Sequence, residues 1–141
     1  MAKPLVTCLW FDGQAEAAAN FYCSVFKDSK ITQVTPMVVT FELNGSKFLG
    51  LNGGPKFKFD EAISLMVNCD NQNEIDYYWD ALTKDGGQES VCGWLKDKFG
   101  LSWQIVPSNL GELMAEPERA QRVMEKVMQM VKIDIATLEN A

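Results

Sequence analysis

The sequence contains no histidine among its 141 residues. Histidine is the commonest metal ligand and the commonest general base near neutral pH, so its absence removes the usual chemistry of many enzyme sites. The four cysteines, Cys8, Cys23, Cys69 and Cys92, show no CxxC spacing and stand among apolar residues. Isolated cysteines of this kind are typical of reduced, buried thiols in a cytosolic protein.

Basic residues are also scarce. Thirteen lysines and arginines stand against 19 acidic residues, which gives a net charge of -6, and no basic run is present. Nucleic acids and anionic membrane surfaces both bind positively charged patches, so we expect neither as a partner. We find no apolar run long enough to span a bilayer and no signal-peptide pattern, and we therefore expect a cytoplasmic protein.

The apolar content, 47% of the residues, is sufficient for a hydrophobic core. The length suits one domain or two small fused modules. Hydrophobic periodicity and turn signals divide the chain into alternating elements. Strands are predicted over 5–11, 31–34, 37–43, 46–51, 62–69 and 101–106, and helices over 14–26, 71–84, 117–131 and 134–138.

A short motif occurs twice in the chain. Residues 12–16 (DGQAE) and 70–74 (DNQNE) match at an offset of 58 residues. Each copy follows an apolar strand, opens a helix and is followed by further strands. The sequence therefore predicts two strand–helix–strands modules, and because each module is too small to bury both faces of its sheet, the two should pair.

The stretch 92–107 (CGWLKDKFGLSWQIVP) predicts a hairpin with a polar turn at 96–100 and a second strand that lies centrally in a sheet. Side chains alternate between the two faces of a strand. Leu101, Trp103 and Ile105 therefore share one strongly apolar face. Gln104 lies on the other face, so a buried sheet presents an amide opposite its hydrophobic core.

Two modules joined by LNGGPKFKFDEAIS and followed by GWLKDKFGLSWQIVP and PERAQRVMEKVMQMVKIDIATLE resemble the PhnB-like branch of the vicinal oxygen chelate superfamily. Glyoxalase I, bleomycin-resistance proteins and extradiol dioxygenases belong to this superfamily. The resemblance implies an α+β fold in which two βαβββ modules form a cup-shaped, mixed but mostly antiparallel sheet, with C-terminal helices. It also implies a homodimer with a pocket inside the cup.

On this resemblance the chain is a single glyoxalase-like domain, 1–141. Module one covers 1–54, the linker 55–61, module two 62–107 and the helical tail 108–141. Two aromatics, Phe57 and Phe59, are expected to anchor the linker to a core more than to contact a ligand. The segment between Ile31 and Met37 is shorter than the family's usual strands, which predicts a clipped edge of the first module.

Metalloenzymes of the superfamily place histidine or carboxylate ligands at four inward positions. The resemblance puts Thr7 at the first position, Leu49 or Leu51 at the second, Ser64 at the third and Gln104 at the fourth. Hydroxyl, amide and apolar side chains are poor ligands for zinc, nickel or iron. We therefore expect no metal and no other cofactor.

The predicted function is metal-free binding of a small molecule of unknown identity in the cup. Hydroxyls and an amide would orient the ligand, and Phe57 could add apolar contact. The predicted lining comprises Thr7, Leu9, Leu49, Leu51, Ser64, Met66, Trp94 and Gln104.

Two alternatives stay open at this point. The first is an enzyme of the superfamily that acts on an unknown metabolite, and the second is a structural dimer whose cup is filled by side chains. Some relatives carry the label demethylubiquinone methyltransferase. No GxGxxG follows a strand here, and the NGGP run at 52–55 precedes a linker. Neither methyl transfer nor a metal-dependent reaction is supported by the residues.

Overall fold

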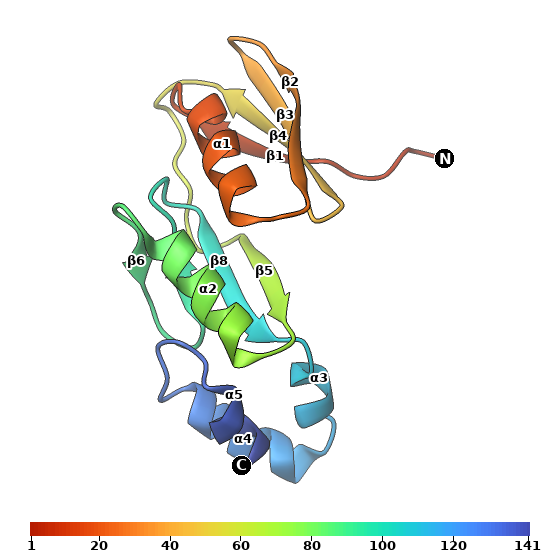
Figure 1. Cartoon of the computed structure of the whole chain (residues 1–141), viewed down its shortest axis with the longest axis vertical. Helices are drawn as coiled ribbons and strands as arrows, with labels where there is room; N and C mark the ends of the chain where they lie inside the picture. The colour runs from red at the N-terminus through yellow and green to blue at the C-terminus, as the bar shows by residue number, and fades with distance from the viewer. The chain divides into compact units, whose positions relative to one another are not determined.

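A computed structural model describes all residues, 1–141, as eight strands and five helices. The chain divides into two compact units, Met1–Phe59 and Asp60–Ala141, so the boundary falls inside the predicted linker. Each unit contains one four-stranded mixed sheet with a helix against it (Figure 1). This arrangement confirms the α+β class and the two predicted modules. No helix has both the length and the apolar character needed to cross a membrane.

The first unit is a βαβββ module. Strand β1 runs parallel to β4, and the remaining neighbours in the order β1-β4-β3-β2 are antiparallel. Its elements are β1 (Thr7–Phe11), α1 (Ala15–Val25), β2 (Ser29–Val34), β3 (Val38–Leu43) and β4 (Ser46–Asn52).

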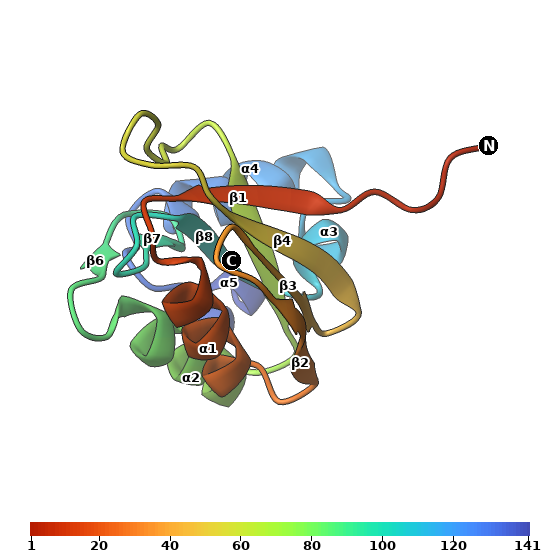
Figure 2. The same ribbon diagram turned by 90° about the horizontal axis from the view of Figure 1, so that it is seen from above.

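Helix α1 lies along one face of this sheet (Figure 2). A Cβ atom built on Gly50 of β4 would lie 3.1 Å from Ala15 Cβ, so helix and sheet are in close contact at this point. The side chain of Asn52 accepts a hydrogen bond from the Ala15 N–H at 2.9 Å and thereby caps the helix. The Tyr22 and Phe41 rings, 6.1 Å apart, form part of the core between them.

The predicted strand 31–34 is wrong in its extent. Strand β2 begins at Ser29 and pairs with β3 along its length, with one register shift between Ile31 and Gln33. A short turn suffices because Thr35 Oγ1 accepts the Val38 N–H at 2.9 Å. The edge strand of this module is thus a full six residues.

The second unit repeats the module. Strand β5 runs parallel to β8, and the order is β5-β8-β7-β6. Its elements are β5 (Ser64–Cys69), α2 (Gln72–Thr83), β6 (Gln88–Glu89), β7 (Trp94–Lys96) and β8 (Ser102–Pro107).

The helix start predicted at 71–74 is confirmed in detail. Asn71 Oδ1 accepts the Glu74 N–H at 2.9 Å, and Glu74 Oε1 accepts the Asp70 N–H at 2.7 Å. These two bonds satisfy amide groups that have no partner within the helix. Helix α2 then turns Ile75 and Leu82, both fully buried, into the core.

The turn of the β7–β8 hairpin is held together by a buried carboxylate. Asp97 is only 2% exposed. Its carboxylate accepts hydrogen bonds from the backbone N–H groups of Phe99 (2.8 Å) and Leu101 (3.1 Å) and from Trp103 Nε1 (2.9 Å). The sequence predicts a polar turn here, but the polar residue faces inward because three donors converge on it.

The helical tail consists of three short helices: α3 (Leu110–Leu113), α4 (Pro117–Val127) and α5 (Ile135–Glu139). The side-chain amide of Gln72 in α2 holds the segment before α5. Its Nε2 donates to the Ile133 carbonyl and its Oε1 accepts the Ile135 N–H, both at 2.9 Å. The Gly93 N–H also donates to the Val131 carbonyl at 2.9 Å. The tail is therefore hydrogen-bonded both to α2 and to the residue that precedes β7.

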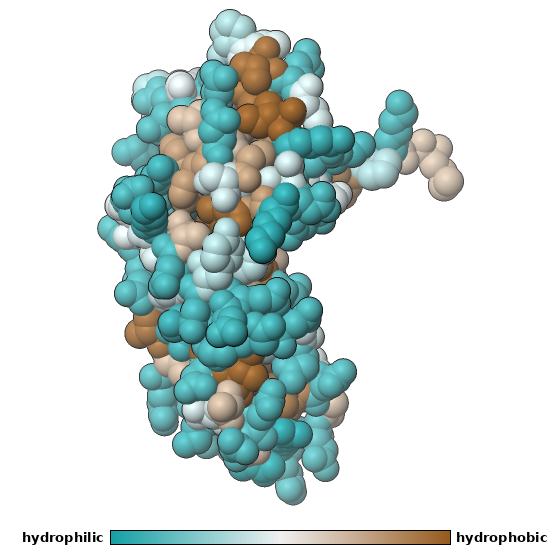
Figure 3. All heavy atoms as spheres, viewed as in Figure 1, coloured by the Kyte–Doolittle hydropathy of each residue, from teal (hydrophilic) through white to brown (hydrophobic).

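Valines and methionines recur at helical spacing in the tail sequence, and the structure separates them into two groups. Val123 and Val127 are buried, at 0% and 7% exposure, whereas Met124 and Met128 are 41% and 70% exposed. On the face shown in Figure 3, hydrophilic side chains cover most of the second unit and apolar side chains appear in small groups. The valines thus pack α4 on its own unit, and the methionines do not.

Candidate functional site

The second sheet has one face packed against α2 and one face opposite it, which we call the open face. Leu95, Trp103 and Ile105 are at most 2% exposed and lie on the α2 side. Because side chains alternate along a strand, their neighbours point the other way. Four residues predicted to line the site share this open face: Ser64, Met66, Trp94 and Gln104.

Strand register arranges the open face in rows. Met66, Gln104 and Trp94 form one row across β5, β8 and β7. The adjacent row comprises Ser64, Ser102, Lys96 and Gln88. Gln104 Nε2 donates to Ser64 Oγ at 2.8 Å and so links the two rows. A fully polar row thus lies beside a row with apolar, aromatic and amide groups.

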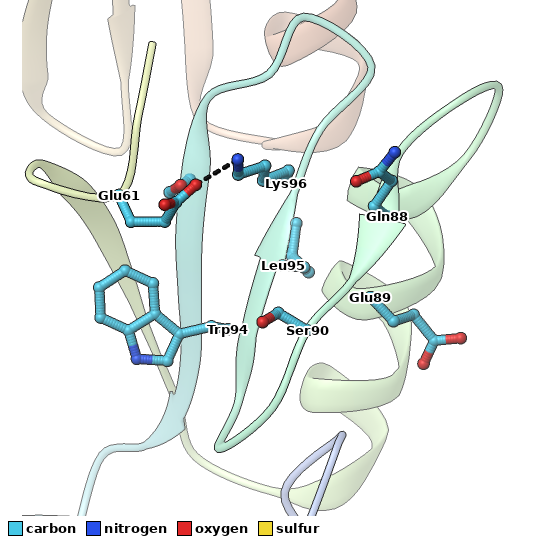
Figure 4. Close-up of a pocket in the computed structure, with 8 residues that line it drawn as sticks. Glu61, Gln88, Glu89, Ser90, Trp94, Leu95 and Lys96 are labelled. Atoms are coloured by element: carbon cyan, nitrogen blue, oxygen red, sulfur yellow. Dashed lines mark ion pairs between the residues drawn. The ribbon is translucent and has the colours of Figure 1, made fainter.

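A cavity of about 320 Å³ borders the outer end of the polar row (Figure 4). Lys96 Nζ and the Glu61 carboxylate form an ion pair that crosses strand β8 in this view. Both side chains are partly exposed, at 36% and 62%. The lining comprises Glu61, Gln88, Glu89, Ser90, Trp94, Leu95, Lys96 and Ser102.

Of the eight residues that line this cavity, sequence reasoning named Trp94 and missed seven, among them Glu61, Lys96 and Ser102. Glu61 was placed in a connector, and Lys96 in a turn. Ser102 has the same strand parity as Gln104, which was a usable signal for its position on the open face. Lys96 and Glu61 are brought together by the pairing of β7 with β8 and by the path of the linker. Local sequence patterns do not predict either of these.

The first sheet places its predicted site residues differently from expectation. Leu9 is 4% exposed and pairs in register with Gly50, which faces Ala15 of α1. Leu9 is therefore a core residue under the helix, and the prediction that it lines a pocket is wrong. Thr7 has the same parity and lies exposed at the start of β1, so it does not share a face with Leu49.

The opposite face of the first sheet contains Leu49 and Leu51, which are half-buried and pair with Cys8 and Trp10. Leu9 lies on the helix side, and not on the predicted pocket side, because the face that contains Leu9 and Phe11 is the more apolar one. Helix α1 covers that face, since an amphipathic helix buries its apolar side against the most apolar surface available.

The linker is anchored to the first unit by aromatic contacts. Trp10 Nε1 donates to the Gly54 carbonyl at 2.9 Å, and the Trp10 and Phe57 rings meet edge to face at 4.9 Å. Phe11 and Phe59 form a second edge-to-face pair at 5.4 Å. Phe59 thus packs on the buried Phe11 as predicted, whereas Phe57 is 55% exposed and rests on Trp10, on the face opposite α1.

The donor groups do not fit the metal of the superfamily's enzymes. Ser64 and Gln104, which the resemblance places at two of the four ligand positions, are neutral and hydrogen-bonded to each other. Nowhere in residues 1–141 do three or more histidine, cysteine, aspartate or glutamate side chains gather. Zinc, nickel and iron sites require imidazole, thiolate or carboxylate ligands, and the open face presents no such set.

The buried thiol of Cys69 is not an activated nucleophile. Burial, together with the negative charges of Glu74 and Asp70, raises its pKa from 9.0 to about 12. Since the thiolate is the reactive form, this cysteine is inert near neutral pH. All four cysteines are free thiols, and Cys8 is the exposed one.

Comparison with known proteins gives one family and many similar folds. The family model described as 3-demethylubiquinone-9 3-methyltransferase matches residues 3–106. A search of curated proteins found no match. The matched family region ends before the helical tail, so the tail is not part of it.

Several solved structures are similar to this chain. A putative 3-demethylubiquinone-9 3-methyltransferase, PhnB protein, from Bacillus cereus is 32% identical, with a TM-score of 0.67 over 74% of this chain and 99% of that one. A glyoxalase-related enzyme from Fulvimarina pelagi is 20% identical, with a TM-score of 0.56 over 74% and 87%. A glyoxalase/bleomycin resistance protein from Albidiferax ferrireducens T118 is 13% identical, with a TM-score of 0.53 over 71% and 93%. The last two show the fold alone.

Proposed function

Because the chain belongs to the PhnB-like family of the vicinal oxygen chelate superfamily, whose family model is named 3-demethylubiquinone-9 3-methyltransferase, we propose that it binds a small molecule without a metal. The proposed site is the open face of the second sheet. Its members in this proposal are Ser64, Met66, Trp94 and Gln104.

The hydrogen bond from Gln104 Nε2 to Ser64 Oγ carries this proposal. It fixes the amide so that Gln104 Oε1 is left to accept a hydrogen bond and the Ser64 hydroxyl proton is left to be donated. Met66, 54% exposed, and the half-buried Trp94 supply apolar surface beside this pair. A few fixed polar groups within apolar surface are the usual composition of a small-molecule site.

Methyl transfer receives no support from this chain. The reaction needs a site for a methyl donor, and no glycine-rich loop connects a strand to a helix here. The glycine pair at 53–54 instead leads into the linker, where the Gly54 carbonyl accepts from Trp10. The name of the family model is therefore not carried over as an activity.

Binding also ranks above the two alternatives. A catalysed reaction needs a nucleophile or an activated acid or base, and the cavity lining contains no histidine or cysteine, while its Glu61 carboxylate is 62% exposed. A structural role with a filled interior is disfavoured by the cavity of about 320 Å³ in the second unit.

We further propose a homodimer in a reducing, cytoplasmic setting. The outer strands β1 and β5 are preceded by exposed apolar residues, with Val6 at 50% and Ile63 at 69% exposure. Unpaired sheet edges with apolar side chains are suited to contact with a second copy. The free cysteines support the reducing compartment. Light scattering coupled to size exclusion should give twice the 15.8 kDa chain mass.

A thermal-shift screen of uncharged and charged metabolites tests the binding proposal, with EDTA present throughout. A ligand that binds the folded state raises the melting temperature by mass action. The shift should shrink in Gln104→Ala and persist in Gln121→Ala, a control at an exposed glutamine of α4. The proposal fails if no compound shifts the wild type, or if EDTA abolishes every shift.

A further inference from the structure

One hydroxyl at the cavity lacks a hydrogen-bond partner. Ser102 is 1% exposed, and its Oγ has no partner among the protein groups. Buried polar groups are nearly always paired, because an unpaired group loses its bonds to water without replacement. Ser102 also lines the cavity, so the missing partner is one that the cavity can hold.

Each charged side chain that lines the cavity already has a partner within the protein. Lys96 is the register partner of Ser102 on the neighbouring strand, and it forms an ion pair with Glu61. The other lining carboxylate, Glu89, accepts a hydrogen bond from Trp79 Nε1 at 3.0 Å and points away from Lys96 in Figure 4. With one ammonium and two carboxylates, the lining carries an excess negative charge that disfavours an anion, and both carboxylates already have a donor, which leaves neither free to pair with a cation.

The remaining wall offers a flat apolar surface. The Trp94 indole is half-buried and lies beside Glu61 on the side of the sheet that faces the viewer in Figure 4. Aromatic faces stack well against planar rings. A cavity of about 320 Å³ is at the small end of ligand sites and accommodates a ligand with one ring.

We infer that this cavity binds an uncharged planar ligand that carries a carbonyl oxygen and an N–H group. The carbonyl oxygen accepts hydrogen bonds from Ser102 Oγ and Lys96 Nζ, and the N–H donates to Glu61. The ring packs on Trp94. The Lys96–Glu61 pair is partly exposed, so it is weak enough to rearrange around an entering ligand. This inference rests on the proposed binding function and names its ligand class.

Three compounds with the same ring and different head groups test it: benzamide, benzoate and benzylamine. Binding is followed by the shift of the Trp94 indole signal in NMR titrations of the full chain. Benzamide should bind with a Kd of about 1–10 mM, as expected for so small a ligand, and about fivefold or more tightly than either charged analogue. If benzoate or benzylamine binds as tightly as benzamide, the inference is overturned.

Two variants locate the contacts. Lys96→Met and Ser102→Ala should each weaken benzamide binding by about fivefold or more, as expected for loss of one ligand hydrogen bond. The matched control is Lys30→Met, which breaks a similar lysine–glutamate pair, Lys30 with Glu42, on the first sheet. Unchanged benzamide affinity in both cavity variants, with intact folding by circular dichroism, contradicts the assignment.

These experiments distinguish failure of the ligand-class inference from failure of the binding proposal. If the metabolite screen yields ligands whose shifts depend on Gln104 but not on Lys96 or Ser102, the inference fails and the binding proposal stands. If no compound of any charge class binds, both fail.

Discussion

Gln104 Nε2 lies 2.8 Å from Ser64 Oγ, so an amide on β8 and a hydroxyl on β5 satisfy each other across two parallel strands. The resemblance predicts that these two positions correspond to ligand positions of the superfamily's metalloenzymes. Here the pair is neutral and internally bonded, which leaves a hydrogen-bonding surface where a cation site would otherwise be built. Substitution of Ser64 and Gln104 by metal-binding residues should therefore be sufficient to create affinity for a metal ion.

The double variant Ser64→His/Gln104→Glu should bind Zn²⁺ or Ni²⁺ about tenfold or more tightly than the wild type, because imidazole and carboxylate replace two poor ligands. Calorimetric titration of both proteins after EDTA treatment measures the difference. The single variants Ser64→His and Gln104→Glu serve as controls and should show intermediate affinity. Tight, stoichiometric zinc binding by the wild type in the sheet would contradict this interpretation of the site.

Asp97→Ala should destabilise the protein by about 2–4 kcal/mol, because the removal of a buried acceptor leaves three donors without a partner. These donors are two backbone amides and the Trp103 indole. Urea unfolding followed by tryptophan fluorescence measures the loss. Asp12→Ala, at an exposed aspartate, is the control and should change stability by less than about 0.5 kcal/mol. Equal effects of the two substitutions would show that the buried carboxylate does not hold the hairpin.

Gln72→Ala should loosen the end of the chain without unfolding the rest. The substitution removes both bonds to the segment before α5, so the Ile135 amide loses its acceptor. Hydrogen exchange at this amide should accelerate by about tenfold or more, while Ile105 in β8 stays protected. Gln129→Ala, at an exposed glutamine, should leave both rates unchanged. Uniform acceleration throughout the unit would mean that the tail is not held locally.

Gly93→Ala should cost about 1–3 kcal/mol of stability. The residue has φ +82°, and an added Cβ would lie 2.9 Å from Ile133 Cγ1 and 3.0 Å from the Ile105 carbonyl oxygen. Gly111→Ala in α3 is the matched control, because nothing lies within 4 Å of its added Cβ. Thermal unfolding of both variants compares them, and a neutral Gly93→Ala would refute the close approach of the tail.

The Cys69 thiol should make stability fall in alkali. Its pKa is raised from 9.0 to about 12 in the folded protein, so the unfolded chain loses this proton first as the pH rises. The stabilisation is complete below about pH 9 and is lost between about pH 9 and 12. Between pH 8 and 10.5, the wild type should therefore lose more unfolding free energy than Cys69→Ala, as measured by urea titration.

The control for this pH effect is Cys8→Ala. Cys8 is exposed, so its removal should leave the pH dependence as in the wild type. A thiol reagent at pH 8 should label Cys8 rapidly and Cys69 only on unfolding. Rapid labelling of Cys69 in the folded protein would contradict its burial.

Much of this architecture follows from local patterns. The repeated motif at 12–16 and 70–74 predicts both helix starts, because a turn, a cap and a first-turn carboxylate are properties of adjacent residues. Alternation along 101–106 correctly separates Trp103 from Gln104, since the period of a strand does not depend on its neighbours. The same alternation groups Ser64 with Met66, but only the register of β5, β8 and β7 places Gln104 and Trp94 on the same face of the sheet.

Other features required the tertiary structure. Alternation groups Leu9 with Phe11 but does not state which face the helix covers, and α1 covers theirs. The local pattern around Asp97 indicates a polar turn, and only the folded chain brings three donors around its carboxylate.

The sequence by itself thus determined the modules, the cap of α2 and which side chains share a face within one strand, whereas the cap of α1 comes from the distant Asn52. Only the tertiary structure decided which face is packed and which polar groups meet, as in the cavity where Glu61, Lys96 and Ser102 converge from three segments. The physical reason is the separation along the sequence of the residues that interact. Caps and strand parity arise from residues close in the chain, whereas burial and charge pairing depend on contacts between distant ones.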